Sequence, residues 1–321
     1  MAETGKDIEK AAELLRAGGL VAIPTETVYG LAANALDANA VMKIFEAKNR
    51  PFFDPLIIHT DSLEKVKGYV TAIPELALQL ATKFWPGPLT LLLPKAAIVP
   101  DIVSSGLDTV AVRIPAHPLT LALLQGIDFP LAAPSANPFG YVSPTQAAHV
   151  AKQLGNKVNY ILDGGECEIG LESTIIGFTD IEEPVVYRLG GLVLEEIEKL
   201  IGKVEMSINQ SSNPKAPGQL KSHYATRKAL LISDDVQQVL DAKKNKRIAV
   251  ISFTAVYKLQ QEGYLKVLSP AGNLKEAAHH LFAAMRQLDE TDAELIVAEK
   301  FPDNFLGRAI NDRLQRAAVI S

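Results

Sequence analysis

Two cations, Lys48 and Arg50, stand two residues apart where a predicted helix ends, in the segment KNRP. Cations at a helix C-terminus often only complement the helix dipole. Here the chain continues at once into the apolar run 55–59, so both cations should lie at the mouth of a sheet. Such a pair suits a phosphate group, because an Arg guanidinium can bind it in a bidentate fork.

Three further segments put polar side chains at the ends or on the faces of predicted strands. Segment 23–31, IPTETVYGL, leaves the first strand, where α/β proteins often bind ligands. In 109–115, TVAVRIP, alternation puts Thr109 and Arg113 on one face, and such an Arg pairs with a bound anion or with a carboxylate of the protein. Segment 132–138, AAPSANP, combines small residues with groups that bind phosphate or sugar oxygens. A Thr-rich turn, an internal ion pair and a Pro/Ser/Asn turn are the ordinary alternatives.

Several standard motifs are missing from the sequence. It has no G-x-x-x-x-G-K-[ST] loop and no G-x-G-x-x-G after a strand, so a nucleotide would not bind through either glycine loop. H-E-x-x-H and G-x-S-x-G are also missing. The single cysteine, Cys167, excludes an internal disulfide and a Cys-cluster zinc site.

Composition limits the class of protein. The chain has 321 residues, 48% of them hydrophobic, which predicts two globular domains. The sequence contains no run of about 18 apolar residues, so we expect no transmembrane helix. The polar start MAETGKDIEK is not a signal peptide, so we expect a cytoplasmic protein. The net charge of −5 divides into −8 for residues 1–204 and +3 for 205–321, so strong direct binding of nucleic acid is not expected.

Hydrophobic periodicity predicts an α/β domain over residues 1–204. The expected helices are 7–16, 39–48, 74–84, 117–125 and 144–153, and the expected strands are 20–23, 55–59, 89–93, 109–114, 130–133, 160–162, 173–177 and 185–188. Several strands follow one another without a helix, so we expect a twisted mixed sheet with flanking helices.

Predicted strands and helices alternate over residues 229–321, and this pattern predicts a small Rossmann-like parallel α/β domain. Its expected strands are 229–232, 248–252, 265–268 and 294–298, and its expected helices are 235–242, 255–262, 273–287 and 306–318. Residues 205–228 between the two domains, rich in Ser, Asn, Pro and Gly, predict a linker.

Taken in order, the motifs resemble one family. PTETVYGL, K-x-R-P-x-x-x-PLIIH, WPGPLT, VAVRIP, APSAN, and DGG followed by EST are similar to the YrdC/YciO family. Lys48, Arg50, Ser135 and Asn137 match the K-x-R…S-x-N set of that family. The ending LGRAINDRLQRAA resembles the long form with a second domain, so the resemblance covers nearly the whole chain.

The resemblance implies a YrdC-like catalytic domain and L-threonylcarbamoyladenylate synthase activity, which is a nucleotidyltransferase reaction. The implied substrates are L-threonine, bicarbonate or CO2, and ATP, with release of pyrophosphate. The product would feed the N6-threonylcarbamoyladenosine modification of tRNA position 37 through downstream transfer machinery. Mg²⁺ is implied as a cofactor held mainly by the ATP phosphates, with no dedicated metal ligands in the protein.

The same resemblance implies the site residues. Lys48 and Arg50 would be the catalytic cations. The implied ATP site comprises Lys48, Arg50, Asp54, Thr109, Ser135, Asn137, Ser143, Arg188, His223 and Tyr224. The implied threonine site comprises Thr27, His59, Arg113, the backbone of Ala133, and Ser173, with Arg113 on the substrate carboxylate.

The role of Asp54, the role of the linker and the competing function each have stated alternatives. Asp54 stands where Asn is common in the family, and an ionised Asp would repel a triphosphate. It should therefore pair with Arg50 or Lys48, or reach ATP through a metal. The linker is expected to fold over the first domain as a lid, with His223 or Tyr224 near the nucleotide, and a plain spacer is the alternative. A non-catalytic double-stranded RNA-binding or regulatory module of the same fold is the competing function.

Overall fold

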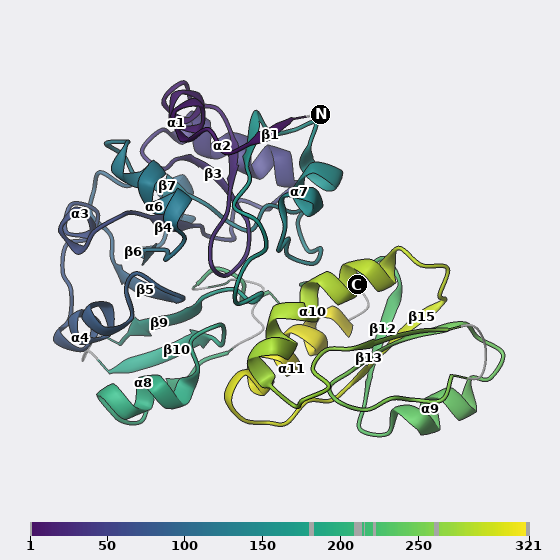
Figure 1. Cartoon of the computed structure of the whole chain (residues 1–321). Coiled ribbons are helices and arrows are strands. Elements are labelled where there is room, and N and C mark those ends of the chain that lie inside the picture. Colours follow the sequence, from purple (N-terminus) through teal and green to yellow (C-terminus); the bar gives the residue numbers. More distant parts are fainter. Residues whose placement is uncertain are drawn as a thin grey trace. The chain divides into compact units, whose positions relative to one another are not determined.

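The computed structural model describes residues 2–179, 183–208, 214, 216–220, 223–259 and 263–318. They form two compact units (Figure 1). The first unit comprises Met1–Phe139, Ser143–Glu168 and Glu172–Leu220, and the second comprises Gly140–Val142, Ile169–Leu171 and Lys221–Ser321. Two short segments that interrupt the first unit in sequence thus belong to the second unit.

The first unit contains a mixed sheet with eleven strands among its described residues. Its strands are β1 (Glu3–Gly5), β2 (Val21–Ile23), β3 (Gly30–Asn34), β4 (Ile57–His59), β5 (Leu89–Pro94), β6 (Thr109–Arg113), β7 (Leu131–Ala132), β8 (Tyr160–Leu162), β9 (Thr174–Phe178), β10 (Pro184–Arg188) and β11 (Glu205–Met206). They lie in the order β1-β8-β2-β3-β7-β4-β6-β5-β9-β10-β11. Several neighbours in this order, such as β3 and β7 or β5 and β9, are far apart in sequence, so site residues from distant segments become neighbours.

Helices flank this sheet. They are α1 (Ile8–Arg16), α2 (Ala38–Lys48), α3 (Leu63–Val66), α4 (Glu75–Phe84), α5 (Asp101–Ser104), α6 (Pro118–Gln125), α7 (Ala147–Leu154) and α8 (Leu194–Ile201). Helix α2 begins after Asp37, whose carboxylate accepts the N–H groups of Asn39 and Ala40. It ends at Lys48, because Asn49 turns into the left-handed region at φ 54°. The C-terminus of α2 therefore fixes the backbone position of Lys48, the first of the two cations predicted to bind phosphate.

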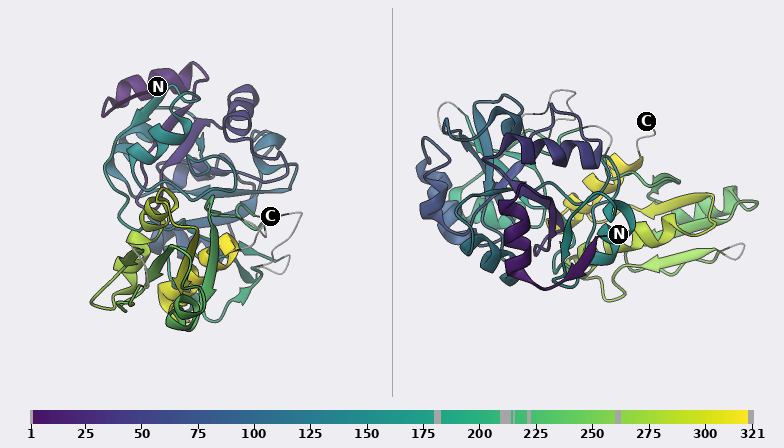
Figure 2. Two further views of the ribbon diagram at one scale, coloured as in Figure 1. Left: turned by 90° about the vertical axis from the view of Figure 1, so that its right-hand side faces the viewer. Right: turned by 90° about the horizontal axis from the view of Figure 1, so that it is seen from above.

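The second unit contains a parallel sheet in the order β12-β15-β13-β14. Its elements are β12 (Ala229–Ser233), α9 (Val236–Ala242), β13 (Ile248–Ser252), β14 (Tyr264–Val267), α10 (Leu274–Asp289), β15 (Leu295–Glu299) and α11 (Phe305–Ala318). Val236 and Leu240 of α9 pack on Ile248 and Val250 of β13. Figure 1 shows α10 and α11 on the other side of this sheet, and Figure 2 shows its strands side by side.

The mixed α/β fold with a second, parallel domain confirms the predicted fold class. The helix expected at 255–262 is wrong for residues 255–259, which are not helical, and 260–262 lie outside the described residues. Tyr257 and Leu259, two positions apart, both pack on the α9 core, which is the spacing of extended chain. Val256 between them is 81% exposed, so the segment has no helical apolar face.

Sequence periodicity also missed β3, which pairs antiparallel with β2. The segment 24–29 is consequently a hairpin loop rather than the start of a long connection. Among the described residues, no helix has the length and hydrophobicity needed to cross a membrane.

Candidate active site

The hairpin loop between β2 and β3 buries Thr25, Glu26 and Thr27. The Thr25 hydroxyl organises the loop, accepting the N–H groups of Thr27 (3.2 Å) and Val28 (3.1 Å) and donating to the Val28 carbonyl (2.6 Å). Its proton is thereby engaged, so Thr27 is the donor in the 2.7 Å contact between the two hydroxyls. Thr27 therefore has only oxygen lone pairs left to offer a ligand.

A row of buried polar side chains crosses five neighbouring strands on one face of the sheet. His59 pairs with Arg113 across β4 and β6, and the register of β5 places Thr90 opposite Arg113. The Thr90 and Ser173 hydroxyls lie 2.7 Å apart. Arg188 donates to the Ser173 hydroxyl (3.1 Å) and carbonyl (3.0 Å). The fold thus brings together three predicted threonine-site residues and Arg188 from the predicted ATP set.

The Arg113 guanidinium is held at the middle of this row. Its Nη2 lies 2.7 Å from Oε1 of Glu26, and its Nε donates to the Gly87 carbonyl at 3.2 Å. The other Glu26 oxygen accepts the N–H of Ala116 at 3.0 Å. The internal ion pair, one of the two alternatives for Arg113, is therefore present. Among the described residues, Nη1 of Arg113 makes no hydrogen bond or ion pair.

Two titratable groups near the row are neutral at pH 7. Burial and the neighbouring Arg113 charge lower the pKa of His59 from 6.5 to about 3. Its imidazole therefore acts as a neutral partner with one donor and one acceptor nitrogen. Burial raises the pKa of the Cys167 thiol, so this cysteine is not poised as a nucleophile.

The Lys48 ammonium is buried and donates to the backbone carbonyls of Ser135 and Asn137. The same loop is held from a second direction, because the Ala136 N–H donates to the Tyr29 carbonyl at 2.8 Å. Helix α2, the hairpin loop and the APSAN segment are therefore joined at one place. The structure brings together Lys48, Ser135 and Asn137, which the K-x-R…S-x-N pattern had grouped.

Arg50 and Asp54 form an ion pair, with 2.9 Å between Nη2 and Oδ2. Arg50 also donates to the carbonyls of Asp54 (3.1 Å) and Pro55 (2.8 Å). The Asp54 side chain is fully buried. Pairing with Arg50 is thus the alternative for Asp54 that the structure contains, and it neutralises a carboxylate that would otherwise repel phosphate.

The remaining predicted residues of the first unit have distinct settings. Ser143 donates to the buried Glu172 carboxylate at 2.6 Å, next to Ser173 in the chain. The Ala133 N–H donates to the Ile57 carbonyl at 3.0 Å, so only its carbonyl could contact a ligand. Thr109 opens β6 and is half-buried.

His223 and Tyr224 belong to the second unit, whereas the other predicted site residues belong to the first. Tyr224 has a φ of 63°, and its ring stacks on Phe282 at 5.5 Å. The guanidinium groups of Arg313 and Arg316 lie 5.0 and 4.9 Å from the Tyr224 ring centre. The buried position of Tyr224 is therefore defined by α10 and α11.

Part of the segment expected as a linker or lid packs on the sheet of the first unit. Ala216 is fully buried in a core cluster with Ile57, Leu92, Ala111 and Ile175. Ile57 and Ala111 precede His59 and Arg113 by two positions on their strands, so they lie on the same face of the sheet. Residues 209–213, 215, 221 and 222 of this segment lie outside the described residues.

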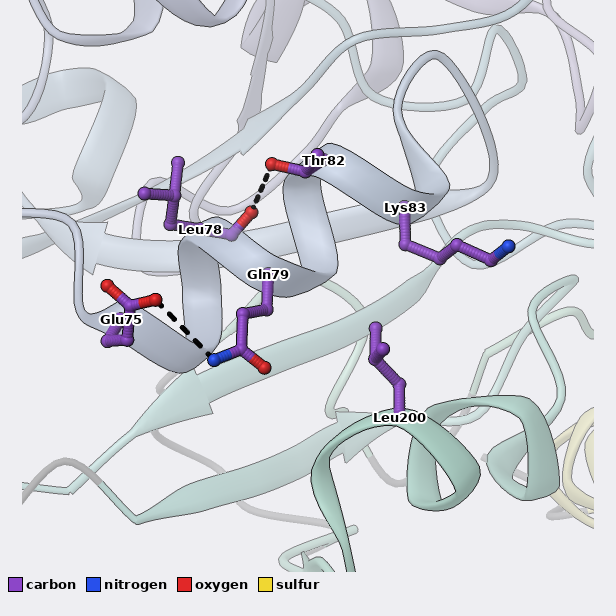
Figure 3. A pocket seen from close by; sticks show the side chains of 6 residues that line it. All are labelled: Glu75, Leu78, Gln79, Thr82, Lys83 and Leu200. Carbon is purple, nitrogen blue, oxygen red and sulfur yellow. Dashed lines mark hydrogen bonds between the residues drawn. The ribbon is translucent and has the colours of Figure 1, made fainter.

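A separate open pocket of about 420 Å³ lies between α4 and α8 (Figure 3). Its lining residues are Glu75, Leu78, Gln79, Thr82, Lys83 and Leu200. None of them is a predicted site residue, and two hydrogen bonds drawn there lie within α4: Thr82 donates to the Leu78 carbonyl and Gln79 to Glu75. We therefore place the site at the polar row and not at this pocket.

Three residues of the site were missed as site residues by the sequence analysis: Glu26, Thr90 and Glu172. Each lies inside a motif that had been noticed, namely PTETVYGL, WPGPLT and EST. Their position inside these motifs is the signal in the sequence that could have indicated them as site residues. Their partners, Arg113, Ser173 and Ser143, are distant in sequence, so the pairing itself was not visible.

Comparison with known proteins covers both units. A family model described as "Telomere recombination" matches residues 13–190, and one described as "Threonylcarbamoyl-AMP synthase, C-terminal domain" matches residues 192–319. The threonylcarbamoyl-AMP synthase of Pyrococcus abyssi is 44% identical to this chain, over 97% of the chain and 94% of the relative. The chain belongs to the threonylcarbamoyl-AMP synthase family. Its motifs had already indicated this membership, which the two family models confirm.

Two further relatives support the membership over the full length. The threonylcarbamoyl-AMP synthase of Bacillus subtilis is 40% identical, over 97% of this chain and 92% of the relative. The crystal structure of P. abyssi Sua5 complexed with L-threonine has a TM-score of 0.92 and 42% identity, over 99% of this chain and 97% of that one. The family membership therefore extends to the second unit.

Proposed function

We propose that the chain synthesises threonylcarbamoyl-AMP from L-threonine, bicarbonate or CO2, and ATP, with release of pyrophosphate. The observation that carries the proposal is the buried row that contains His59, Arg113 and Ser173 in a chain of this family. We place the enzyme in the cytoplasm. Its product would supply the machinery that makes N6-threonylcarbamoyladenosine in tRNA.

The proposed reaction needs positioning and charge neutralisation, with no covalent intermediate on the protein. The neutral threonine amine forms a bond to the carbon of CO2 and loses a proton, or forms a bond to the carbon of bicarbonate, in which case the proton leaves with the bicarbonate hydroxyl as water. One oxygen of the resulting carbamate attacks the α-phosphorus of ATP. The bond from that phosphorus to the β-phosphate oxygen breaks, and pyrophosphate leaves. Fixed cations stabilise the charge that develops in such a displacement.

On the threonine side, Arg113 would bind the substrate carboxylate through Nη1, because Glu26 and Gly87 engage Nη2 and Nε. The neutral His59 imidazole lies beside it, across the β4–β6 pair. Thr27, Ser173 and the Ala133 carbonyl would supply the remaining polar contacts. A pocket with matched polar groups rejects an amino acid that lacks the hydroxyl.

On the nucleotide side, Lys48 and Arg50 would neutralise the triphosphate. The uncharged groups would hold phosphate and ribose oxygens: Thr109, Ser135, Asn137 and Ser143. Arg188, and by family resemblance His223 and Tyr224, complete the proposed ATP contacts. The second unit carries the last two of these residues.

Mg²⁺ suits this site as a partner of the phosphates. Both carboxylates that contact proposed ATP residues are already engaged, Asp54 by Arg50 and Glu172 by Ser143. The other groups gathered there are cations, hydroxyls and an amide, which suit phosphate oxygens better than a bare cation. Mg²⁺ would therefore arrive on ATP, where it neutralises phosphate charge, while Lys48 and Arg50 orient the chain of phosphates.

The direct test incubates the purified chain with ATP, L-threonine and bicarbonate, and measures pyrophosphate together with the adenylate by mass spectrometry. We expect both products only when all three substrates are present. Pyrophosphate release that does not depend on threonine would contradict the proposal. Binding of double-stranded RNA without any pyrophosphate release would favour the non-catalytic alternative.

A further inference from the structure

Two segments of the second unit are continuous in the chain with proposed substrate residues. Gly140–Val142 lies between Asn137 and Ser143, and Ile169–Leu171 directly precedes Glu172 and Ser173. The chain therefore enters the second unit twice. It returns to the first unit at Ser143 and at Glu172, which are hydrogen-bonded to each other. Both segments contact the same helix, α10.

The first segment is held by the last turn of α10. The Tyr141 hydroxyl donates to the Asp289 carboxylate at 2.6 Å. The Arg286 guanidinium lies over the Tyr141 ring, 5.1 Å from its centre, and donates to the Val142 carbonyl. Arg286 and Asp289 are three residues apart, so they share one face of the helix.

The Asp289 carboxylate is itself fixed from its other side. It accepts the N–H of Lys228 at 3.0 Å and the Nε of Arg227 at 2.9 Å. Asp289 is buried, so its charge depends on these partners and on Tyr141. A carboxylate held by three donors is a rigid support for the segment that ends at Ser143.

The second segment packs against the middle of α10 through a glycine. Gly170 has a φ of 75°, and a Cβ placed on it would lie 2.5 Å from the His279 carbonyl oxygen and 2.7 Å from that of Ala278. A side chain is excluded both by the backbone conformation and by the helix backbone. Gly170 thus lets Ile169–Leu171 lie directly on α10.

We propose that α10 is a positioning element for both halves of the active site. Asp289 and Arg286 hold Tyr141, which sets the nucleotide segment that ends at Ser143. Gly170 lets the other segment lie against the same helix, which sets Glu172 and Ser173. The two segments meet again where Ser143 donates to Glu172 at 2.6 Å. This inference rests on the proposed function only for the identity of the substrates.

The first arm of the test is Tyr141→Phe, which removes the hydrogen bond to Asp289 and keeps the ring under Arg286. The matched control is Tyr264→Phe, which removes an exposed hydrogen bond to Asp292 (2.8 Å) in the same unit. Losing a hydrogen bond to a buried charged group typically weakens an equilibrium by about tenfold. We expect Tyr141→Phe to raise KM for ATP by about tenfold, to leave KM for threonine within about twofold, and Tyr264→Phe to change neither.

The second arm is Gly170→Ala, which places a methyl group against the backbone of α10. The substituted residue lies two positions before Glu172 in the chain. The matched control is Gly202→Ala, since Gly202 has a similar φ of 83° but open space around its Cβ position. We expect Gly170→Ala to raise KM for threonine more than KM for ATP, by at least about tenfold in the ratio. Gly202→Ala should change neither constant, although both variants lose some stability through backbone strain.

A third readout needs no substrate. Hydrogen exchange in the ligand-free protein should be faster at the Ala136 and Phe139 amides of Tyr141→Phe, and unchanged in Tyr264→Phe. If Tyr141→Phe lowers Tm but leaves both KM values and this exchange as in the wild type, α10 only stabilises the fold and the inference is wrong. A wild-type chain inactive with the three substrates would overturn the proposed function, while the exchange result would still decide the role of α10.

Discussion

The Arg113 guanidinium and the Glu26 carboxylate form a buried ion pair, with 2.7 Å between Nη2 and Oε1 and side-chain exposures of 4% and 7%. Glu26 comes from the hairpin loop and Arg113 from β6. The pair leaves the guanidinium with a defined orientation and with Nη1 available. The same carboxylate keeps the buried cation compensated when no substrate is bound.

Removing this carboxylate should destabilise the protein. Breaking a buried ion pair leaves an uncompensated charge, so Glu26→Gln should lower the free energy of unfolding by about 3 kcal/mol. Adding Arg113→Met to Glu26→Gln should cost less than Arg113→Met alone. Urea denaturation of the four proteins measures this coupling. The control is Glu64→Gln, which breaks an exposed pair with Lys67 (2.8 Å) and should cost less than about 1 kcal/mol. Additive effects of the two buried substitutions would contradict a coupled pair.

Lys48 and Arg50, the cations proposed to bind the ATP phosphates, should be essential for turnover. Lys48→Ala and Arg50→Ala should each lower the rate of pyrophosphate release by about a hundredfold, because each removes a fixed cation from the developing charge. Lys43→Ala is the control, since this exposed residue of the same helix donates its ammonium to the Gly18 carbonyl (2.7 Å) and is not a proposed site residue. Near-normal turnover of both Lys48→Ala and Arg50→Ala would remove the basis for the proposed ATP site.

The substrate pocket should distinguish threonine by both its hydroxyl and its methyl group. Serine lacks the methyl, which is worth about 1–3 kcal/mol in a fitted pocket, so serine should be a poor but measurable substrate. Valine lacks the hydroxyl and should be rejected more strongly, because polar groups of the pocket would remain unpaired. Relative kcat/KM values for the three amino acids test this order. Equal use of threonine and valine would show that no group reads the hydroxyl.

Stability should depend on pH through His59. Its pKa of about 3 in the folded protein lies below the ordinary value of 6.5, because of burial and the Arg113 charge. The unfolded chain therefore binds one proton more between pH 6.5 and pH 3, and the free energy of unfolding should fall as pH falls through this window. The contribution has a slope of at most about 1.4 kcal/mol per pH unit.

The carboxyl groups titrate in part of the same window, so the variant His59→Gln isolates the histidine. Its free energy of unfolding, measured by urea denaturation from pH 7 to pH 4, should fall less steeply than that of the wild type. Identical slopes for His59→Gln and the wild type would show that His59 titrates normally.

The segment around Ala216 should cover the sheet face that carries the site. Ala216→Glu would place a charge among Ile57, Leu92 and Ala111, so residues 216–220 should leave the sheet. We expect faster limited proteolysis between 205 and 228 and lower activity, with both units still folded. The control Ala97→Glu lies on the surface. In the wild type, ATP plus threonine should protect residues 214–226, and cleavage insensitive to both would favour a plain spacer.

Sequence patterns predicted most elements of both units because helical and strand periodicity are local. They failed at 255–259, where Tyr257 and Leu259 face the α9 core at a two-residue spacing inside an apparently helical run. The grouping of Lys48, Ser135 and Asn137 was also predictable, because it rests on a motif set. The partners of Arg113 and Asp54 were not, since each had several alternatives that only packing could separate.

The family, the division into two α/β parts and the residue types that the chemistry requires can be read from the amino-acid sequence, because motifs and periodicity are local patterns along the chain. Which of these residues meet depends on the three-dimensional fold. Strand order in the sheet places His59, Arg113, Thr90, Ser173 and Arg188 in one row. Long-range contacts with α10 likewise place Tyr141 and Gly170 in the second unit. These pairings depend on hydrogen bonds and packing between residues far apart in sequence, which no local pattern specifies.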